Sequence, residues 1–129
     1  MQVVPNFGPD VVPPPAFIRE SFGPLIVAFT ATTALVMIRF PHWSITSWWR
    51  DPLSNSDVGG DLFSQHLVGL AFDADGPEEE RIPFVLAHKQ VGHVTVPEET
   101  HVHWQSFPAG FLRRFTQPQG PGRVAVPCP

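Results

Sequence analysis

A run of seventeen residues without a charged, amide or histidine side chain, from Phe22 to Ile38, restricts the fold more than any other feature of this sequence. As an α-helix the run would be about 26 Å long, slightly less than the roughly 30 Å hydrocarbon core of a bilayer. Ser21 is a suitable N-cap, Pro24 would fall in the first turn, and Pro41 would end the helix. The run therefore predicts a single-pass transmembrane helix.

Charged and aromatic side chains flank this run on both sides. Long cationic side chains can extend toward lipid headgroups, and tryptophan concentrates at the boundary between lipid and water. Three of the four tryptophans of the chain follow the run closely. The predicted membrane-interface residues are Arg19, Arg39, Trp43, Trp48 and Trp49.

Small side chains recur along one stripe of the predicted helix, at Ala28, Ala31, Thr32 and Leu35. Small residues let helices approach each other closely within lipid. We therefore expect this stripe to pack against a helix of another protein. The alternative is that alanine and threonine are simply common in membrane spans.

Two other interpretations of the apolar run were weighed against a membrane span. A buried core helix that is apolar all round needs protein on every side, and the rest of this chain is short for that purpose. A signal peptide would have a positive charge before the run, but residues 1–17 contain none and include several prolines.

The pattern changes after the run, which divides the chain into five predicted segments. We expect a Pro-rich arm over residues 1–18, the membrane helix with its flanks over 19–42, an irregular linker over 43–61, a small antiparallel β-rich domain over 62–107, and a second Pro-rich arm over 108–129. Short runs rich in β-branched and aromatic residues predict the strands of that domain. The predicted strands are Gln65–Phe72, Ile82–His88, Val91–Val96 and Thr100–Phe107.

Both Pro-rich arms are expected to remain extended, because proline presets the backbone and lowers the entropy lost on binding. In the second arm Phe107, Phe111, Leu112 and Phe115 are predicted to anchor the chain on a partner subunit. Disorder of the arms is the alternative.

Histidines provide the main candidates for a metal site. His101 and His103 share one face of a predicted strand, and His88 and His93 lie on neighbouring runs. Three of these nitrogens could converge on zinc or iron, so a small β-barrel metal protein or enzyme is one alternative function. The acidic residues Asp73, Asp75, Glu78, Glu79 and Glu80 are expected to form a solvated loop.

The remaining observations exclude several classes of function. With 8 basic and 12 acidic residues the chain has no cationic surface for nucleic acid. The single cysteine, Cys128, lies in a Pro-flanked tail, and no nucleophile motif is present. No catalytic residue and no cofactor are therefore predicted.

This architecture is typical of a non-catalytic accessory subunit in a large membrane complex. We expect its partners to be the lipid bilayer and other subunits of an energy-converting assembly, either a respiratory-chain complex or ATP synthase. The predicted location is the mitochondrial inner membrane, with the thylakoid membrane as the alternative. A free-standing bitopic adaptor that recruits a soluble partner is another alternative.

Overall fold

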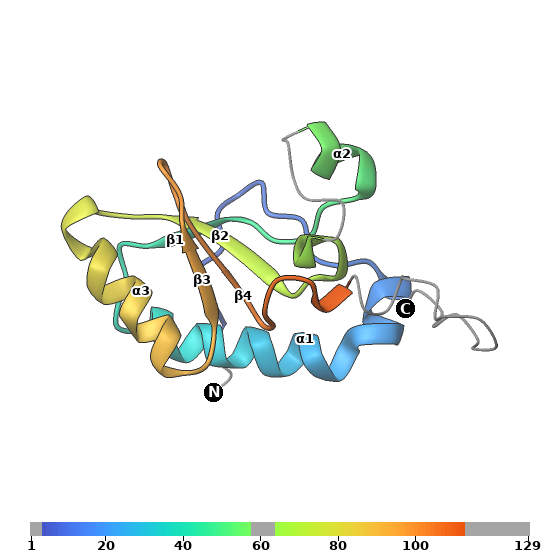
Figure 1. The fold of residues 1–129 in the computed structure, drawn as a ribbon, viewed down its shortest axis with the longest axis horizontal. Helices are drawn as coiled ribbons and strands as arrows, with labels where there is room; N and C mark the ends of the chain where they lie inside the picture. The colour runs from blue at the N-terminus through green and yellow to red at the C-terminus, as the bar shows by residue number, and fades with distance from the viewer. Residues whose placement is uncertain (1–3, 58–63, 113–129) are drawn as a thin grey trace.

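A four-stranded antiparallel sheet with strand order β1-β2-β4-β3 organises the fold (Figure 1). The computed structural model describes residues 4–57 and 64–112. Three α-helices and two short 3₁₀ helices accompany the strands. The elements are α1 (Ala16–Met37), β1 (Ser44–Ser47), α2 (Pro52–Asp57), η1 (Gln65–Val68), β2 (Ala71–Asp75), η2 (Glu78–Glu80), α3 (Arg81–Gln90), β3 (Val94–Pro97) and β4 (Val102–Gln105).

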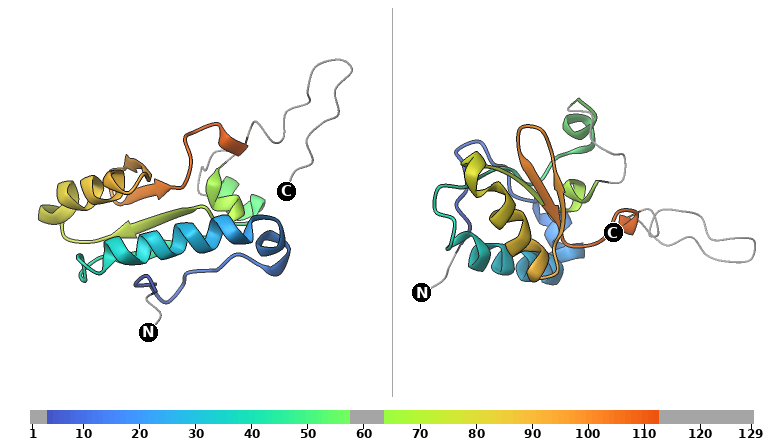
Figure 2. Two further views of the ribbon diagram at one scale, coloured as in Figure 1. Left: turned by 90° about the horizontal axis from the view of Figure 1, so that it is seen from below. Right: turned by 60° about the vertical axis from the view of Figure 1, so that its left-hand side comes forward.

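The side chains of the two central strands alternate between a buried core face and a polar face, as the pleat of a sheet requires. On the core face Phe72 of β2 stacks on Phe29 of α1, with ring centroids 5.0 Å apart. Trp104 of β4 contacts Phe84 and His88 of α3 on the same face. Both long helices therefore cover one face of the sheet (Figure 2), while Asp73 and His103 project from the other.

Helix α1 begins at Ala16 after Pro15, six residues before the predicted start, so Pro24 lies inside the helix and Ser21 is not its cap. One side of the helix is buried against the core and the other side is exposed. It is long and apolar enough to cross a membrane by length and composition, but a core helix meets the same criteria. The buried residues are Ile18, Phe22, Ile26, Phe29, Thr33, Ala34, Val36 and Met37.

The structure thus confirms an N-terminal apolar helix and a small antiparallel sheet, and it does not establish a single-pass span. The structure buries α1 on one side only, which differs from the expectation that a core helix is surrounded by protein on every side. A sheet needs to cover only one side of such a helix, and a short chain can provide that.

Two of the four predicted strands were placed correctly. Strand β3 lies within the predicted strand Val91–Val96, except that it extends by one residue to Pro97. Strand β4 lies within the predicted strand Thr100–Phe107. The predicted strand Gln65–Phe72 is instead η1 followed by the first residues of β2. The predicted strand Ile82–His88 is helix α3, whose residues Phe84, Val85 and His88 recur on one buried side. Strand β1 lies in the segment predicted to be an irregular linker.

The tryptophans that follow α1 are packing residues of the fold. Trp43 is 2% exposed and stacks on Phe84, with ring centroids 4.0 Å apart. Trp48 and Trp49 are half-buried and donate their indole N–H groups to the carbonyls of Gly69 and Leu67. A buried ring cannot reach headgroups, so the prediction of an interfacial Trp43 was wrong.

The described parts of both arms lie against this chain's own core. In the N-terminal arm Phe7 pairs with Ile45 of β1 and stacks on Trp48. In the C-terminal arm Phe107 stacks on Phe111, with centroids 4.0 Å apart, and Leu112 is buried. These predicted partner anchors therefore pack within the chain, and Phe115 lies outside the described residues.

Gly69 sets the turn between η1 and β2. Its φ of 76° lies in the left-handed region, which a side chain strongly disfavours. A Cβ at this position would also come within 2.4 Å of the Pro14 ring. The glycine thus lets η1 fold back beside β2 and brings His66 close to the middle of that strand.

Candidate metal centre

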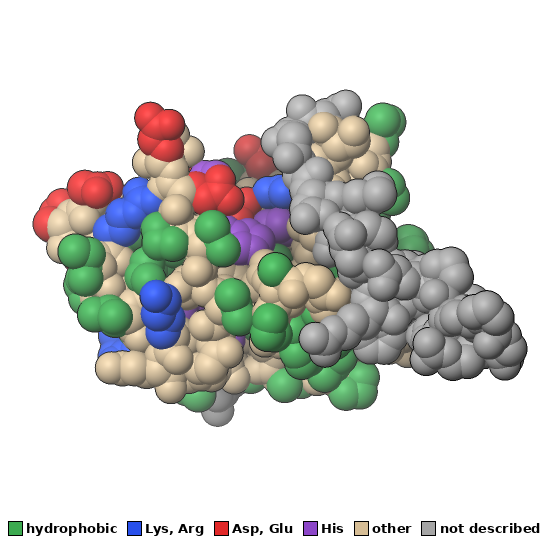
Figure 3. Space-filling model, in the orientation of Figure 1, with side chains coloured by type: hydrophobic (Ala, Val, Ile, Leu, Met, Phe, Trp, Pro, Cys, Tyr) green, Lys and Arg blue, Asp and Glu red, His purple; other side chains and the backbone are tan. Residues whose placement is uncertain are grey.

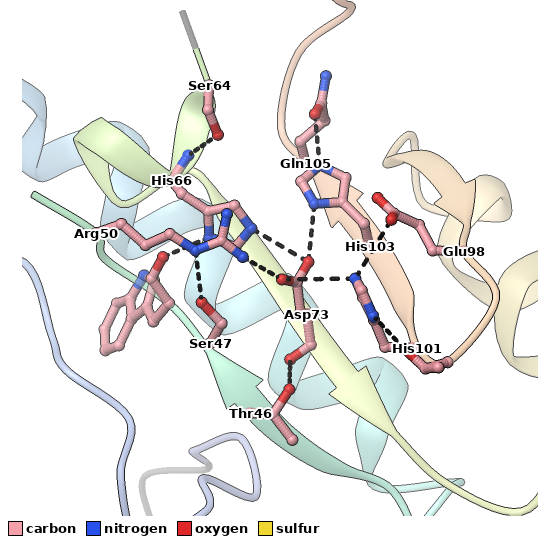
Figure 4. Close-up of polar contacts among 12 residues, drawn as sticks. Thr46, Ser47, Arg50, Ser64, His66, Asp73, Glu98, His101, His103 and Gln105 are labelled. Atoms are coloured by element: carbon pink, nitrogen blue, oxygen red, sulfur yellow. Dashed lines mark hydrogen bonds and ion pairs between the residues drawn. The ribbon is translucent and has the colours of Figure 1, made fainter. Parts of the chain in front are cut away.

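Three potential metal ligands meet on the polar face of the sheet, opposite α1 (Figure 4). Asp73 lies on β2, and His103 is its direct cross-strand partner on β4. His66 comes from η1, just before β2. One nitrogen or oxygen from each residue lies within 4.8 Å of the other two. The pairing of two strands and a tight turn therefore bring together residues that are far apart in the sequence.

One carboxylate oxygen is the centre of this cluster. Asp73 Oδ1 lies 2.9 Å from His103 Nδ1 and 3.2 Å from His66 Nε2. His66 and Asp73 are buried, while His103 is half-buried. The cluster is consequently reached from the His103 side.

The tautomer of His66 is fixed by its other ring nitrogen. His66 Nδ1 contacts the backbone carbonyl of Trp48, which can only accept a hydrogen bond. The proton of the neutral ring therefore resides on Nδ1. The lone pair on Nε2 is left pointing toward Asp73.

The side-chain amide of Gln105 orients the His103 ring. Gln105 Nε2 donates to the carbonyl of Phe107 at 2.8 Å, which directs its Oε1 toward His103. His103 Nε2 lies 2.7 Å from that oxygen and donates to it. The lone pair of His103 Nδ1 is thus directed at Asp73 as well.

Two imidazole lone pairs and a carboxylate that converge on one point repel each other unless a cation lies between them. Ligand atoms in a tetrahedral zinc site, with bonds of about 2.0 Å, are about 3.3 Å apart. Asp73 Oδ1 lies at close to this separation, 2.9 and 3.2 Å, from the two histidine nitrogens. Two histidines and one carboxylate are a set used by catalytic zinc sites, which keep the fourth position open. The outer hydrogen bonds to Trp48 and Gln105 are the kind that orient ligands in such sites. The residues therefore fit a divalent metal ion, and zinc best.

The pKa shifts of the three residues are those expected of a site that holds a positive charge. Burial raises the pKa of Asp73, but the interactions with the adjacent imidazoles of His103 and His66 outweigh burial and hold that pKa below its usual range. Burial lowers the pKa of His66. Burial also opposes protonation of His103, yet its bonds to Asp73 and Gln105 raise its pKa overall. A proton on His103 can thus supply the charge when no metal is bound.

Arg50 lies beside the second oxygen of the same carboxylate. Its Nη2 pairs with Asp73 Oδ2, and its Nε donates to Ser47 Oγ at 3.2 Å. Its backbone N–H donates to the carbonyl of His66 at 3.1 Å. Asp73 therefore presents Oδ1 to the histidines and Oδ2 to a guanidinium, which favours a metal bond through Oδ1 alone.

A second carboxylate stands at the rim of the cluster. Glu98 lies in the turn between β3 and β4, and its Oε2 is 3.7 Å from His101 Nε2. His101 Nε2 is also 3.8 Å from Asp73 Oδ2, so His101 bridges the rim and the ligand cluster. Arg81 of α3 holds this turn by donating to the carbonyls of His101 at 3.1 Å and Glu99 at 3.4 Å.

The predicted histidine candidates separate into two groups. His103 belongs to the cluster and His101 adjoins it. His88 and His93 lie in the core, where their Nδ1 atoms are 2.8 Å apart and their rings contact Trp104 and Phe29. These two do not reach the cluster, because they lie in the core against the opposite face of the sheet.

His66 and Asp73 were missed as ligands. Asp73 was assigned to a solvated acidic loop, whereas it is 4% exposed in the middle of β2. His66 was placed in a strand that is instead η1. The sequence did contain a signal for them: His66 stands seven residues before Asp73 with Gly69 between them, and a His-x-His pair follows later in the chain.

Comparison with known proteins agrees with this geometry. The family model described as Peptidase M15 matches residues 41–105, which is half of the chain and includes His66, Asp73 and His103. The chain belongs to the Peptidase M15 family. No curated protein and no solved structure gives a significant match.

Membership of the Peptidase M15 family overturns three predictions. A non-catalytic accessory subunit was the expected function, and the family points to a hydrolase. The prediction that the chain is not an enzyme is wrong for the same reason, as is its assignment to a respiratory or electron-transport complex. The mitochondrial and thylakoid locations were inferred from the assignment to such a complex, so that argument no longer supports them.

Proposed function

We propose that this Peptidase M15 member is a metal-dependent peptide hydrolase whose metal is held by His66, Asp73 and His103. The observation that carries the proposal is the approach of one ring nitrogen from each of two histidines to the same oxygen of Asp73. A divalent metal at this position supplies a Lewis acid that activates water and polarises the scissile carbonyl. The half-buried position of His103 leaves an approach for substrate from that side.

Glu98 is the best candidate for the general base. A general base must lie within reach of the proton it removes, and Glu98 is the carboxylate at the rim of the ligand cluster. Its side chain is 50% exposed, so substrate and water have access to it. Its bond to His101, together with the anchoring of the turn by Arg81, limits the positions it can take.

Arg50 is the candidate for stabilising negative charge on the substrate. Its guanidinium has more N–H donors than Asp73, Ser47 and Asn55 occupy. A developing oxyanion beside the ligand cluster would lie next to this cation. Such preorganised donors commonly contribute the largest share of transition-state stabilisation.

The test is metal content followed by hydrolysis. The purified chain should contain one equivalent of zinc by plasma mass spectrometry and should release fragments from a mixture of short peptides. Removing the metal with a chelator should abolish cleavage, and added zinc should restore it. His66→Ala and Asp73→Asn should abolish both metal retention and cleavage.

A matched control is offered by His42, which is exposed and pairs only with Glu80 at 3.7 Å among the residues described. His42→Ala removes a histidine without touching the cluster, so it should keep full metal content and activity. The proposal fails if the wild-type chain binds no divalent metal, or if His66→Ala and His42→Ala behave alike.

For helix α1 we propose a structural role in the catalytic domain in place of a transmembrane span. The support is its packing: Thr33 accepts a hydrogen bond from Trp104, and eight of its side chains are buried. Moving α1 into a bilayer would expose the core face of the sheet, including Phe72 and Trp104. The loss of that burial would unfold the metal-binding strands.

A further inference from the structure

The outer face of α1 is unusual for a helix on a protein surface. We define the α1 outer face by six exposed residues, Phe17, Leu25, Val27, Ala31, Leu35 and Ile38, of which the last four recur at helical spacing along one stripe. Val27 and Leu35 are 69% and 64% exposed. Surface helices normally carry polar and charged residues on this side. Here no charged residue occurs between Glu20 and Arg39.

None of the six residues that define this face has a polar side chain. The Thr32 hydroxyl donates to the carbonyl of Ala28 at 2.9 Å, within its own helix. Among the residues that the structure describes, no other segment passes in front of α1 when it is viewed from below (Figure 2). The face is therefore apolar, internally satisfied and open.

A second copy of the chain is a poor match for this surface. A helix of 22 residues is about 33 Å long and about 10 Å wide, so its outer strip offers on the order of 300–500 Å². A stable protein interface buries about 800 Å² on each partner. An interface made by this strip alone would be too small.

The charges around the face match an anionic surface. Arg19 and Arg39 are exposed at its two ends, and Glu20 is the one acidic residue of the helix. The acidic side chains that are visible in Figure 3 lie above α1, toward α3 and the metal centre. Each end of the apolar strip thus carries an exposed arginine, with Glu20 next to Arg19 at one end.

We propose that the α1 outer face docks onto an anionic lipid surface, with the helix lying parallel to the bilayer and remaining part of the fold. Apolar side chains enter the boundary between headgroups and acyl chains, and the bordering arginines contact lipid phosphates. Phe17 contacts Trp49 at one end of the face, with centroids 6.4 Å apart, and aromatic rings are favoured at this depth.

Docking through this face would determine which way the metal centre faces relative to the bilayer. The ligands project from the sheet face opposite α1, so docking turns the site away from the bilayer. The enzyme would then act on peptides in the aqueous layer next to a membrane. This inference concerns location and does not depend on the hydrolytic activity.

The experiment is sedimentation of the full chain with phosphatidylcholine vesicles, with and without phosphatidylglycerol. We expect the wild type to bind the anionic vesicles and to bind less as salt is raised. Leu35→Glu and, independently, Val27→Glu place a charge on the face and should weaken binding about tenfold. Leu53→Glu is the matched control, because Leu53 is 74% exposed on α2, and it should bind like the wild type.

Retained zinc content and an unchanged thermal midpoint would show that the Leu35→Glu and Val27→Glu variants are folded. The inference is overturned if the wild type binds neither vesicle, or if Leu53→Glu weakens binding as much as Leu35→Glu. It is also overturned if Leu35→Glu dissociates a dimer, since a second copy would then cover the face. Resistance to alkaline carbonate would overturn it in favour of a span.

Discussion

Trp104 donates its indole N–H to the Thr33 hydroxyl at 3.1 Å, and this bond joins the metal-binding strand β4 to the core helix α1. The preceding residue on β4 is His103, which points to the opposite face. Both partners of the bond are fully buried. The position of the metal ligand is therefore tied to the packing of α1.

Thr33→Val should lower the free energy of unfolding by about 1–3 kcal/mol, because it leaves the Trp104 N–H buried without an acceptor. Denaturant unfolding measures this change. Thr32→Val is the matched control: its hydroxyl bonds only to the carbonyl of Ala28 in the contacts described, so its effect should stay within about 0.5 kcal/mol. Equal effects would show that the Trp104 bond contributes no stability.

Gln105→Ala should weaken zinc binding about tenfold or more, because His103 loses the acceptor that keeps its proton on Nε2. Gln105→Glu should retain most of the affinity, since its carboxylate accepts the same bond. Competition with a chromophoric chelator gives the affinities. A loss that is the same for both substitutions would contradict this account of the tautomer.

Glu98→Gln should lower kcat by about 10²–10⁴-fold with zinc content unchanged, since it removes the candidate general base and leaves the ligands in place. Glu99→Gln removes the neighbouring carboxylate and should keep most of the activity. Steady-state kinetics on a cleaved peptide distinguish the two. Full activity of Glu98→Gln would assign the proton transfer to another group.

Arg81→Lys should lower kcat with little change in zinc content. Lysine cannot reproduce the two hydrogen bonds that Arg81 makes to the turn carrying Glu98. Arg81 acts here as a positioning residue. A matched loss of zinc would instead show that Arg81 supports the whole fold.

The buried His88–His93 pair predicts a loss of stability in mild acid. Burial, with contributions from His93 and Arg39, lowers the pKa of His88 to about 2, and burial lowers the pKa of His93 to about 4. In the unfolded chain these two histidines bind protons near pH 6.5, whereas in the folded chain they stay neutral, so their contribution to stability is fully present above that pH and falls as pH decreases. Each histidine adds a slope of about 1.4 kcal/mol per pH unit.

The free energy of unfolding, measured between pH 7 and 4, checks this prediction. The double variant His88→Gln with His93→Gln should be less stable at pH 7 but should show a shallower decline than the wild type. His42→Gln, at the surface, should follow the wild-type curve. A double variant with the wild-type slope would assign the acid sensitivity to other groups.

The sequence alone determined the elements whose pattern is local. The uncharged run from Phe22 to Ile38 specified an apolar helix, and the alternating residues of β3 and β4 specified strands. Ile82–His88 was ambiguous, because its apolar residues fit both a period of two and a helical period, and packing of Phe84 and His88 against Trp104 decided for a helix.

Only the tertiary structure decided the surroundings of these elements. The composition of a helix does not show whether lipid or a sheet covers it, and here one side contacts the sheet and the other is open. The metal centre likewise depends on pairing β2 with β4, which places Asp73 beside His103 across thirty positions of sequence. The sequence offered His88 and His93 as candidates beside His101 and His103, but His88 lies on α3 and His93 precedes β3, and both pack in the core on the face of the sheet opposite the ligands.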